Sequence, residues 1–355
     1  MCTTVDHSRE LNPVATCEDE VALPAPLIER SRTYMAGARA ERTRQAYSAA
    51  WDHFTGWCTA HGRRPLPADP ATVAAWITAL ADGTHGGSRP LALATINQYL
   101  CAVVLAHHTA GHAFDRKHPL LAETWRGISP HKARTRPLRQ AKALMGEDLR
   151  SIIEGLQPGS ALDARDAALL LLGWSAALRR AELIGLDWMQ LGSGTGYVSI
   201  EERGLVVTLP TSKGSQEAAV TVVVPCQDMR SACDAMERWA ATANLQRGQA
   251  VFRGVNKGGE IATNRLTARS VALIIKARVY KLAIARGKSE QEAGELADSF
   301  SGHSMRAGYA TTASEHDVPG YRIQQRMRHK STDTTGGYIR AGQAWTKSGL
   351  KGFGF

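Results

Sequence analysis

Two arginines, two histidines and a late tyrosine have the residue types that could cut a phosphodiester. They are Arg179, His303, Arg306, His329 and Tyr338. A phosphodiester gathers further negative charge on its non-bridging oxygens in the transition state, so an enzyme without a metal needs fixed cations there. Guanidinium groups offer paired donors for such oxygens. A phenol becomes a nucleophile when cations or a base lie nearby. The set therefore predicts cleavage through a covalent tyrosyl link.

The spacing of the two arginine motifs predicts how these cations are held. Arg179 lies in Ala-Leu-Arg-Arg-Ala-Glu-Leu at the end of an apolar helix, and Glu182 follows one turn later, where it can hold the arginine. His303 and Arg306 lie in Ser-Gly-His-Ser-Met-Arg and are expected on one helical face. Each pair alone has a simpler explanation, because isolated Arg-x-x-Glu pairs are usually surface ion pairs and His-x-x-Arg is common.

Tyr338 follows a polar segment, residues 331–337, that ends in two glycines. These residue types favour turns, so we expect a bend or a mobile segment that presents the hydroxyl to a phosphate. Most lone tyrosines are packing or interface residues. The upstream arginines favour the catalytic interpretation here.

With these motifs the sequence resembles the tyrosine recombinases, also called the phage integrase family. Members typically show Gly-Leu-Arg-x-x-Glu-Leu, a lysine in a β-hairpin, His-x-x-Arg, a His or Trp, and a late tyrosine. Here Ala177 replaces the glycine of the first motif, and Lys213 in Thr-Ser-Lys-Gly-Ser matches the hairpin lysine. The motifs of His303, His329 and Tyr338 match the others.

The resemblance also implies a fold and a subgroup. The fold is mainly α with a small β-sheet: an N-terminal helical core-binding (SAM-like) domain and a mixed α/β catalytic domain form a C-shaped clamp on DNA. Residues 51–70 and the Ser-Gly-His-Ser wording resemble Cre-like members, although Cre has a tryptophan where this chain has His329. The resemblance covers roughly residues 30 to 341.

The family's chemistry implies roles for the nucleophile and the proton donors. Tyr338 attacks the scissile phosphate, forms a 3′-phosphotyrosyl link and frees a 5′-hydroxyl. Lys213 protonates the leaving 5′ oxygen, and His303 assists as proton acceptor or phosphate ligand. Because the covalent link conserves the bond energy, no cofactor or metal is expected, and the sequence has no Gly-x-x-x-x-Gly-Lys phosphate loop.

The resemblance assigns the remaining site residues to the phosphate. Arg179, Arg306 and His329 hold its oxygens, and Glu182 orients Arg179. Whether His329 hydrogen-bonds the phosphate or mainly packs stays open. The implied partner is double-stranded DNA with short inverted-repeat sites, on which four copies of the chain join two sites and exchange strands through a Holliday junction.

Composition and periodicity divide the chain into five segments. These are a disordered lead-in (1–25), a helical bundle (26–130), a basic interdomain linker (131–142), the catalytic domain (143–341) and a C-terminal tail (342–355). The apolar residues of the tail could dock on a neighbouring protomer or form a frayed end.

Apolar residues recur at helical spacing in the second segment. We expect helices at 47–58, at 70–82 between the N-cap Asp69 and the stop Gly83, at 96–104, and a shorter one from Pro119. In the catalytic segment we expect an apolar helix at 163–178, strands at 197–200, 205–209 and 219–224 with a hairpin turn at 211–215, and helices at 227–242, 267–285, 304–315 and 320–328.

The linker holds five basic residues and no acid. Pro137 prevents a continuous helix, and the charge suits a path along a phosphate backbone. The alternative is a solvated linker without contacts. The candidate DNA-binding residues are Lys132, Arg134, Arg136, Arg139 and Lys142.

The formal net charge of +10 over 355 residues favours a polyanionic partner. The longest apolar stretch, residues 167–178, is too short to span a bilayer, so no membrane partner is expected. Six widely spaced cysteines without a Cys-x-x-Cys pair argue against a zinc site and against a disulfide framework. With no leader pattern, this predicts a reducing, cytoplasmic location near the nucleoid of a prokaryote, phage or plasmid host.

Other interpretations remain. His107, His108 and His112 could suggest a metal site, but Gly111 and the lack of a nearby carboxylate or cysteine favour a solvated helix end. A type IB topoisomerase-like enzyme shares the tyrosyl chemistry, and a non-catalytic sequence-specific DNA-binding protein could share the fold. Because every catalytic position is filled by a suitable residue, the last is the weakest.

Overall fold

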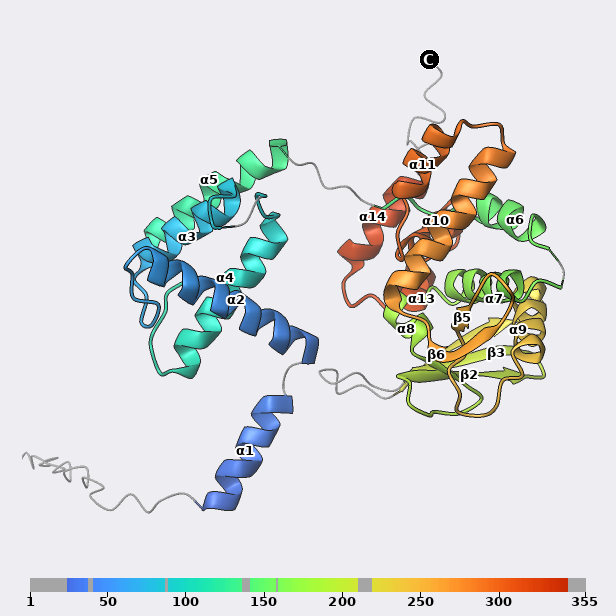
Figure 1. The fold of residues 1–355 in the computed structure, drawn as a ribbon, viewed down its shortest axis with the longest axis horizontal. Helices are drawn as coiled ribbons and strands as arrows, with labels where there is room; N and C mark the ends of the chain where they lie inside the picture. The colour runs from blue at the N-terminus through green and yellow to red at the C-terminus, as the bar shows by residue number, and fades with distance from the viewer. Residues whose placement is uncertain are drawn as a thin grey trace, which may run out of the picture. The chain divides into compact units, whose positions relative to one another are not determined.

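The computed structural model describes residues 24–37, 41–86, 89–135, 141–157, 159–209 and 219–343. The chain divides into two compact units, Met1–Arg136 and Pro137–Phe355, which are described separately (Figure 1). The predicted disordered lead-in up to residue 23 and the tail from residue 344 lie outside the described residues.

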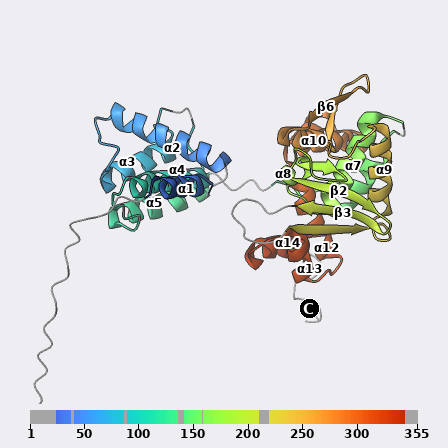
Figure 2. The same ribbon diagram turned by 90° about the horizontal axis from the view of Figure 1, so that it is seen from below.

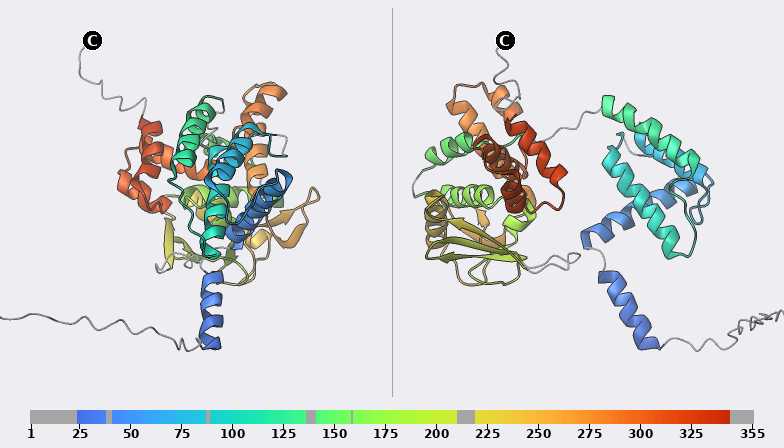
Figure 3. Two further views of the ribbon diagram at one scale, coloured as in Figure 1. Left: turned by 90° about the vertical axis from the view of Figure 1, so that its left-hand side faces the viewer. Right: turned by 180° about the vertical axis from the view of Figure 1, so that it is seen from behind.

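The N-terminal unit is a helical bundle, as the apolar spacing predicted. Its helices are α1 (Ala25–Gly37), α2 (Glu41–Ala60), α3 (Pro70–Asp82), α4 (Leu93–Thr109) and α5 (Pro119–Thr135). Helix α2 packs against α4 and α3 packs against α5 (Figure 3). The core is formed by apolar side chains from four of these helices, among them Phe54, Trp76, Leu80, Ile96, Leu100 and Leu121.

Helix α3 begins and ends where the sequence predicts. The Asp69 side chain accepts a hydrogen bond from the Thr72 N–H at 2.7 Å, and Pro70 occupies the first turn. Gly83 ends the helix with φ +83°, and a Cβ there would lie 2.9 Å from the Pro90 nitrogen. Only glycine fits this close approach without strain.

The structure corrects two predictions for this unit. The helix end is solvated at His108, as predicted, but His107 is fully buried. The His107 Nε2 accepts from the Ala68 N–H at 2.8 Å, and its Nδ1 lies 2.8 Å from the Val103 carbonyl. Burial lowers the pKa of His107. Helix α5 is not short, because packing on α3 carries it past Pro130 to Thr135, through the first residues of the predicted linker.

The second unit contains the mixed structure that was expected. Its helices are α6 (Gly146–Glu154), α7 (Ala161–Ser175), α8 (Arg180–Ile184), α9 (Arg230–Thr242), α10 (Ala268–Ala285), α11 (Glu290–Asp298), α12 (Ser304–Glu315), α13 (Gly320–Met327) and α14 (Thr332–Gln343). Its strands are β1 (Leu186–Trp188), β2 (Gly196–Glu201), β3 (Gly204–Leu209), β4 (Val220–Pro225), β5 (Arg253–Val255) and β6 (Ile261–Arg265). The predicted fold class, mainly α with a small sheet, is confirmed.

A four-stranded sheet in the order β1-β2-β3-β4 lies along α7 and α9 (Figure 2). Strand β1 pairs parallel with β2, and the other neighbours are antiparallel. The three predicted strands are β2, β3 and β4. Leu209 pairs with Val220 at the end of the β3–β4 ladder, so these strands flank the expected hairpin turn, which lies outside the described residues.

Helix α7 is buried along its length and carries charged residues into the core. Asp166 binds Arg165 at 2.5 Å and Arg278 of α10 at 2.6 Å, and Arg278 also pairs with Asp163. Buried charges are tolerated only when they are paired in this way. The network holds α10 against α7. The C-terminal end of α7 leads into the candidate site.

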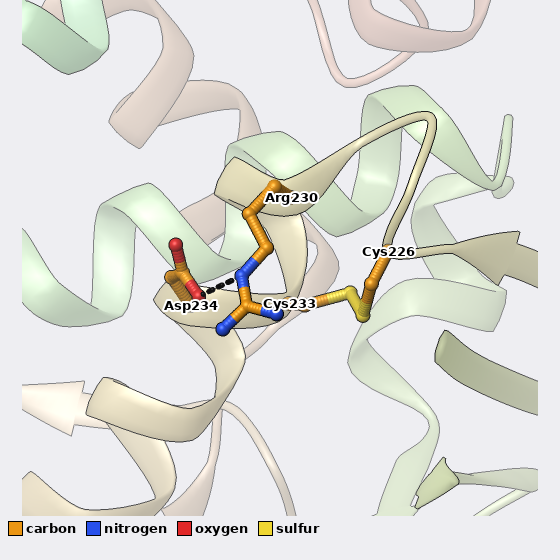
Figure 4. The surroundings of a disulfide bond; sticks show 4 residues. All are labelled: Cys226, Arg230, Cys233 and Asp234. Carbon is orange, nitrogen blue, oxygen red and sulfur yellow. Dashed lines mark hydrogen bonds and ion pairs between the residues drawn. A yellow bond between two sulfur atoms is a disulfide. The ribbon is translucent and has the colours of Figure 1, made fainter. Parts of the chain in front are cut away.

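The cysteine spacing argues against a disulfide framework, but the structure contains one disulfide bond. Cys226, just after β4, and Cys233 in α9 are bonded with an S–S distance of 2.07 Å (Figure 4). The connection between strand and helix brings their Cα atoms to 5.9 Å, a juxtaposition that the separation of seven residues alone does not reveal. The cysteine pattern therefore gives no support for a reducing compartment.

In the described part of the chain, no helix has the length and apolar character needed to cross a membrane. The same residues include no group of three or more His, Cys, Asp or Glu side chains that could hold a metal ion.

Candidate active site

The predicted site residues converge where α12, α13 and α14 meet the turn between α7 and α8. Helix α12 packs against α7, α13 and α14, and α13 packs against α14 (Figure 2). These elements come from distant parts of the sequence. Their packing brings the arginine motif at 179, the His-x-x-Arg motif and Tyr338 into one region.

Arg179 was predicted to end the apolar helix, but it is the N-cap residue of α8. Helix α7 ends at Ser175, and Ala177, with φ +46°, turns the chain before α8 begins. The predicted contact with Glu182 is present: its Oε1 accepts from Arg179 Nη1 and its Oε2 from the Arg179 backbone N–H, both at 2.7 Å. The Arg179 side chain stays 46% exposed, so solvent or a ligand can reach it.

Arg306 of α12 is buried beneath this turn. Its Nη1 donates to the Ala177 carbonyl at 2.6 Å, and its Nη2 donates to the Met327 carbonyl. Burial, together with the charges of Arg179 and Arg328, lowers the pKa of Arg306 to about 10. The group is therefore still a cation at neutral pH, in a place where its charge is poorly screened.

His303 is the N-cap residue of α12 and is exposed, whereas Arg306 lies inside the helix and is buried. The predicted common helical face is therefore only partly realised. Partial burial and the nearby charges of Arg180, Arg306 and Arg179 lower the pKa of His303. A neutral imidazole is available to accept a proton near pH 7.

Tyr338 lies in a helix, and the prediction of a turn or mobile segment before it is wrong. Helix α14 begins at Thr332, where the Asp333 N–H donates to Ser331 Oγ, and it includes both glycines. Each glycine disfavours a helix by about 1 kcal/mol, but packing of α14 on α12 and α13 outweighs this. Tyr338 packs at the edge of an apolar cluster that includes Ala310 and Ile323.

His329 contacts Tyr338 and is close enough to the arginines for their charges to affect it. Its ring stacks on that of Tyr338 with centroids 6.2 Å apart, and its Nδ1 lies 2.9 Å from the hydroxyl of the buried Thr335. Burial and then the charges of Arg306, Arg179 and Arg328 lower the pKa of His329 to about 4. His329 is therefore neutral at physiological pH and is held in one orientation.

The other predicted residues are not part of this cluster as described. Lys213 lies outside the described residues, as do Arg136 and Arg139. Lys132 is in α5 and only 7% exposed, so its assignment to the basic interdomain linker is wrong.

Two further linker residues lie in described segments. Arg134 is in the last turn of α5, where its side chain is not described, and Lys142 is exposed, with its N–H donating to the Ser299 carbonyl at 2.9 Å.

Sequence reasoning missed Arg328, the residue before His329. Its guanidinium forms an ion pair with Glu182 at 2.6 Å, and Arg179 Nη2 donates to its carbonyl at 3.3 Å. The only signal was an arginine next to a motif histidine. Within the described cluster, Arg179, Arg306 and Arg328 surround one carboxylate, so the site retains a positive charge that suits a phosphate.

Known proteins that resemble this chain belong to one family. Residues 142–344 match the family model for the phage integrase family. An integrase/recombinase XerD homolog from Selenomonas ruminantium is 27% identical over 326 residues, covering 90% of this chain and 88% of the relative. A tyrosine recombinase XerC from Myxococcus xanthus is 29% identical over 223 residues, covering 60% of this chain and 61% of the relative.

A solved structure supports the fold. The Tn1549 transposon integrase in complex with transposon right-end DNA aligns with a TM-score of 0.54 and 16% identity, covering 91% of this chain and 98% of that one. The family model spans more than half of the 355 residues. The chain therefore belongs to the phage integrase family and is a tyrosine recombinase.

Proposed function

We propose that this enzyme is a site-specific recombinase that cuts and rejoins duplex DNA through a 3′-phosphotyrosyl intermediate. Strands are exchanged in pairs through a Holliday junction. The observation that carries the proposal is the convergence of two guanidinium groups and Tyr338 from distant segments. The positive net charge and the DNA-bound Tn1549 neighbour support duplex DNA as the partner.

Arg179 and Arg306 bind the scissile phosphate from two sides of the turn at Ala177. Arg179 is half-exposed and oriented by Glu182, while Arg306 is anchored to two carbonyls. An arginine has five N–H donors, so Arg306 keeps three that make no hydrogen bond to the described residues. These remaining donors stabilise the charge that develops on the phosphate oxygens.

Tyr338 is the nucleophile. Its oxygen attacks phosphorus, the bond from phosphorus to the 5′ oxygen breaks, and Lys213 donates a proton to that oxygen. The neutral His303 accepts the tyrosyl proton. The stacked His329 restricts the tyrosine ring. Religation is the reverse reaction with a new 5′-hydroxyl, so no nucleotide cofactor is consumed.

The proposed assembly is the one that the family resemblance implies. Four protomers join two sites with short inverted repeats, and the two units of each protomer clamp the duplex. The C-terminal tail docks on a neighbouring protomer, and Lys142, Arg134, Arg136 and Arg139 contact phosphates. The enzyme works on the cytoplasmic nucleoid. Membership of a Cre-like subgroup stays a prediction.

The test combines capture of the intermediate with two activity assays. The full chain is incubated with a pool of randomised nicked duplexes, and DNA that stays attached after denaturation in SDS is sequenced. We expect a site with inverted repeats, and a plasmid with two such sites should recombine. Relaxation of supercoils without recombination would indicate a topoisomerase-like enzyme. Binding without any adduct from a native, folded protein would indicate a non-catalytic DNA-binding protein.

A further inference from the structure

We propose that Arg328 is a positioning residue of the active site, which sets Glu182 and, through it, Arg179. The inference rests on the proposed function and adds a residue that the family motifs do not assign. Arg328 is the C-cap residue of α13 and lies directly before His329. Its backbone precedes the segment that carries Tyr338, and its side chain contacts the turn that precedes Arg179.

The hydrogen bonds of Arg328 reach across this junction. Its Nη2 donates to Glu182 Oε2 at 2.6 Å and to the Ala177 carbonyl at 3.2 Å. Its Nη1 donates to the Ala176 carbonyl at 3.3 Å and to the Arg326 carbonyl at 2.9 Å. All four Nη hydrogens are thus used within the protein. Since the Nε is buried, Arg328 has no exposed donor for a phosphate and acts through other residues.

The Glu182 carboxylate forms ion pairs with both Arg179 and Arg328. Its Oε2 accepts from Arg328 and from the Arg179 backbone, and its Oε1 accepts from the Arg179 side chain. Without Arg328 the carboxylate would have only Arg179 as its ionic partner and would neutralise the cation that binds the phosphate. Arg328 offsets that negative charge, so Arg179 keeps its affinity for a phosphate oxygen.

The backbone at Arg328 also indicates a role for its side chain. Arg328 has φ +54° and ψ +45°, a left-handed conformation that glycine adopts freely and arginine rarely adopts. Such an outlier is retained where the surrounding contacts stabilise it, often at a functional site. The turn between α7 and α8, which Arg328 contacts, contains Ala177. This residue also has a positive φ, and its carbonyl accepts from both Arg306 and Arg328.

The variant Arg328→Gly tests this inference, because it removes the guanidinium without backbone strain. The probe is a nicked duplex recovered in the selection described above. We expect DNA binding in a gel-shift assay to be unchanged and single-turnover cleavage to slow by about 100-fold, as for a reacting group displaced by about 1 Å. Arg328→Lys should slow cleavage less, because it keeps the charge but not the planar fork. The control Arg322→Gln removes an exposed cation of α13 and should cleave normally.

Two readouts separate positioning from a merely structural role. Free guanidinium, at concentrations that leave the fold intact, should accelerate cleavage by Arg328→Gly and not by Tyr338→Phe. In a double-mutant cycle, Arg328→Gly should cost much less in Glu182→Gln than in the wild type, because both act on Arg179.

The outcomes are distinct. Normal cleavage by Arg328→Gly, equal losses of binding and cleavage, or additive effects in the cycle would overturn the inference. If Arg328→Gly fails to fold, Arg328→Lys decides by the same readouts. A wild-type protein that forms no adduct would overturn the proposed function and this inference with it.

Discussion

Replacement of Glu182 by glutamine tests, by a measurement of protein stability, whether this carboxylate compensates the charges of the neighbouring arginines. The carboxylate is the only acid that the described structure places among Arg179, Arg306 and Arg328. Burial favours its neutral form, but the charges of Arg328 and Arg179 and the Arg179 hydrogen bonds outweigh burial and lower the pKa of Glu182. At neutral pH the side chain is therefore ionised, and Glu182→Gln leaves Arg328 as an uncompensated, buried cation.

The size of the effect follows from the exposure of the partners. Removing one member of a buried ion pair costs about 3–5 kcal/mol. Arg328 is 11% and Glu182 19% exposed, whereas Arg179 is 46% exposed and can turn to solvent. We therefore expect the lower end, about 3 kcal/mol. For a unit of this size each kcal/mol lowers the melting temperature by about 2–4 °C, so a decrease of about 6–12 °C is expected.

Thermal unfolding followed by circular dichroism measures this shift, with the exposed Glu315→Gln of α12 as the matched control. Because the pKa of Glu182 is lower in the folded than in the unfolded chain, its stabilisation is present above pH 4.5 and is lost as the pH falls through the folded value. The gap between wild type and Glu182→Gln should close in acid. A shift no larger than that of Glu315→Gln at pH 7, or a gap independent of pH, would refute the reasoning.

Three further predictions concern DNA, protons and assembly. If the clamp makes about 6–10 phosphate contacts, DNA affinity should fall about 10³- to 10⁵-fold between 50 and 200 mM salt, and a flat response in a titration series would contradict it. Since the pKa of His329 is lowered from 6.5 to about 4, the unfolded chain takes up its proton first, so stability should fall as the pH drops from 6.5 towards 4. His329→Asn should reduce this loss in melting curves, and an equal loss would argue against a buried neutral imidazole. Deletion of residues 342–355 should impair synapsis of two sites more than binding of one, and unchanged synapsis in native gels would exclude tail docking.

Local patterns predicted much of the fold because their signals are local. The cap at Asp69, the stop at Gly83 and the alternation in β2, β3 and β4 depend on neighbouring residues, and all were confirmed. Helix α14 was missed because its packing on α12 outweighs two glycines. Glycine propensity is a weak guide where tertiary contacts dominate.

The errors at the site and elsewhere share one physical cause, which is contact between different secondary-structure elements. The role proposed for Arg328 depends on the contact between the end of α13 and the turn at Ala177, which its place beside a motif histidine does not reveal. The Cys226–Cys233 bond and the burial of His107 against Ala68 likewise depend on how elements meet. The motif residues could be proposed from the sequence because their types report chemistry directly, whereas their helical settings depend on packing.

The central claim is that the Tyr338 oxygen becomes esterified to the broken strand. Trypsin digestion of the SDS-resistant adduct, followed by mass spectrometry, identifies the attached residue directly. The account predicts a nucleotide on Tyr338 in the peptide 331–340 and no adduct with Tyr338→Phe. A nucleotide on Tyr321 or any other residue, or an adduct that persists with Tyr338→Phe, would contradict it.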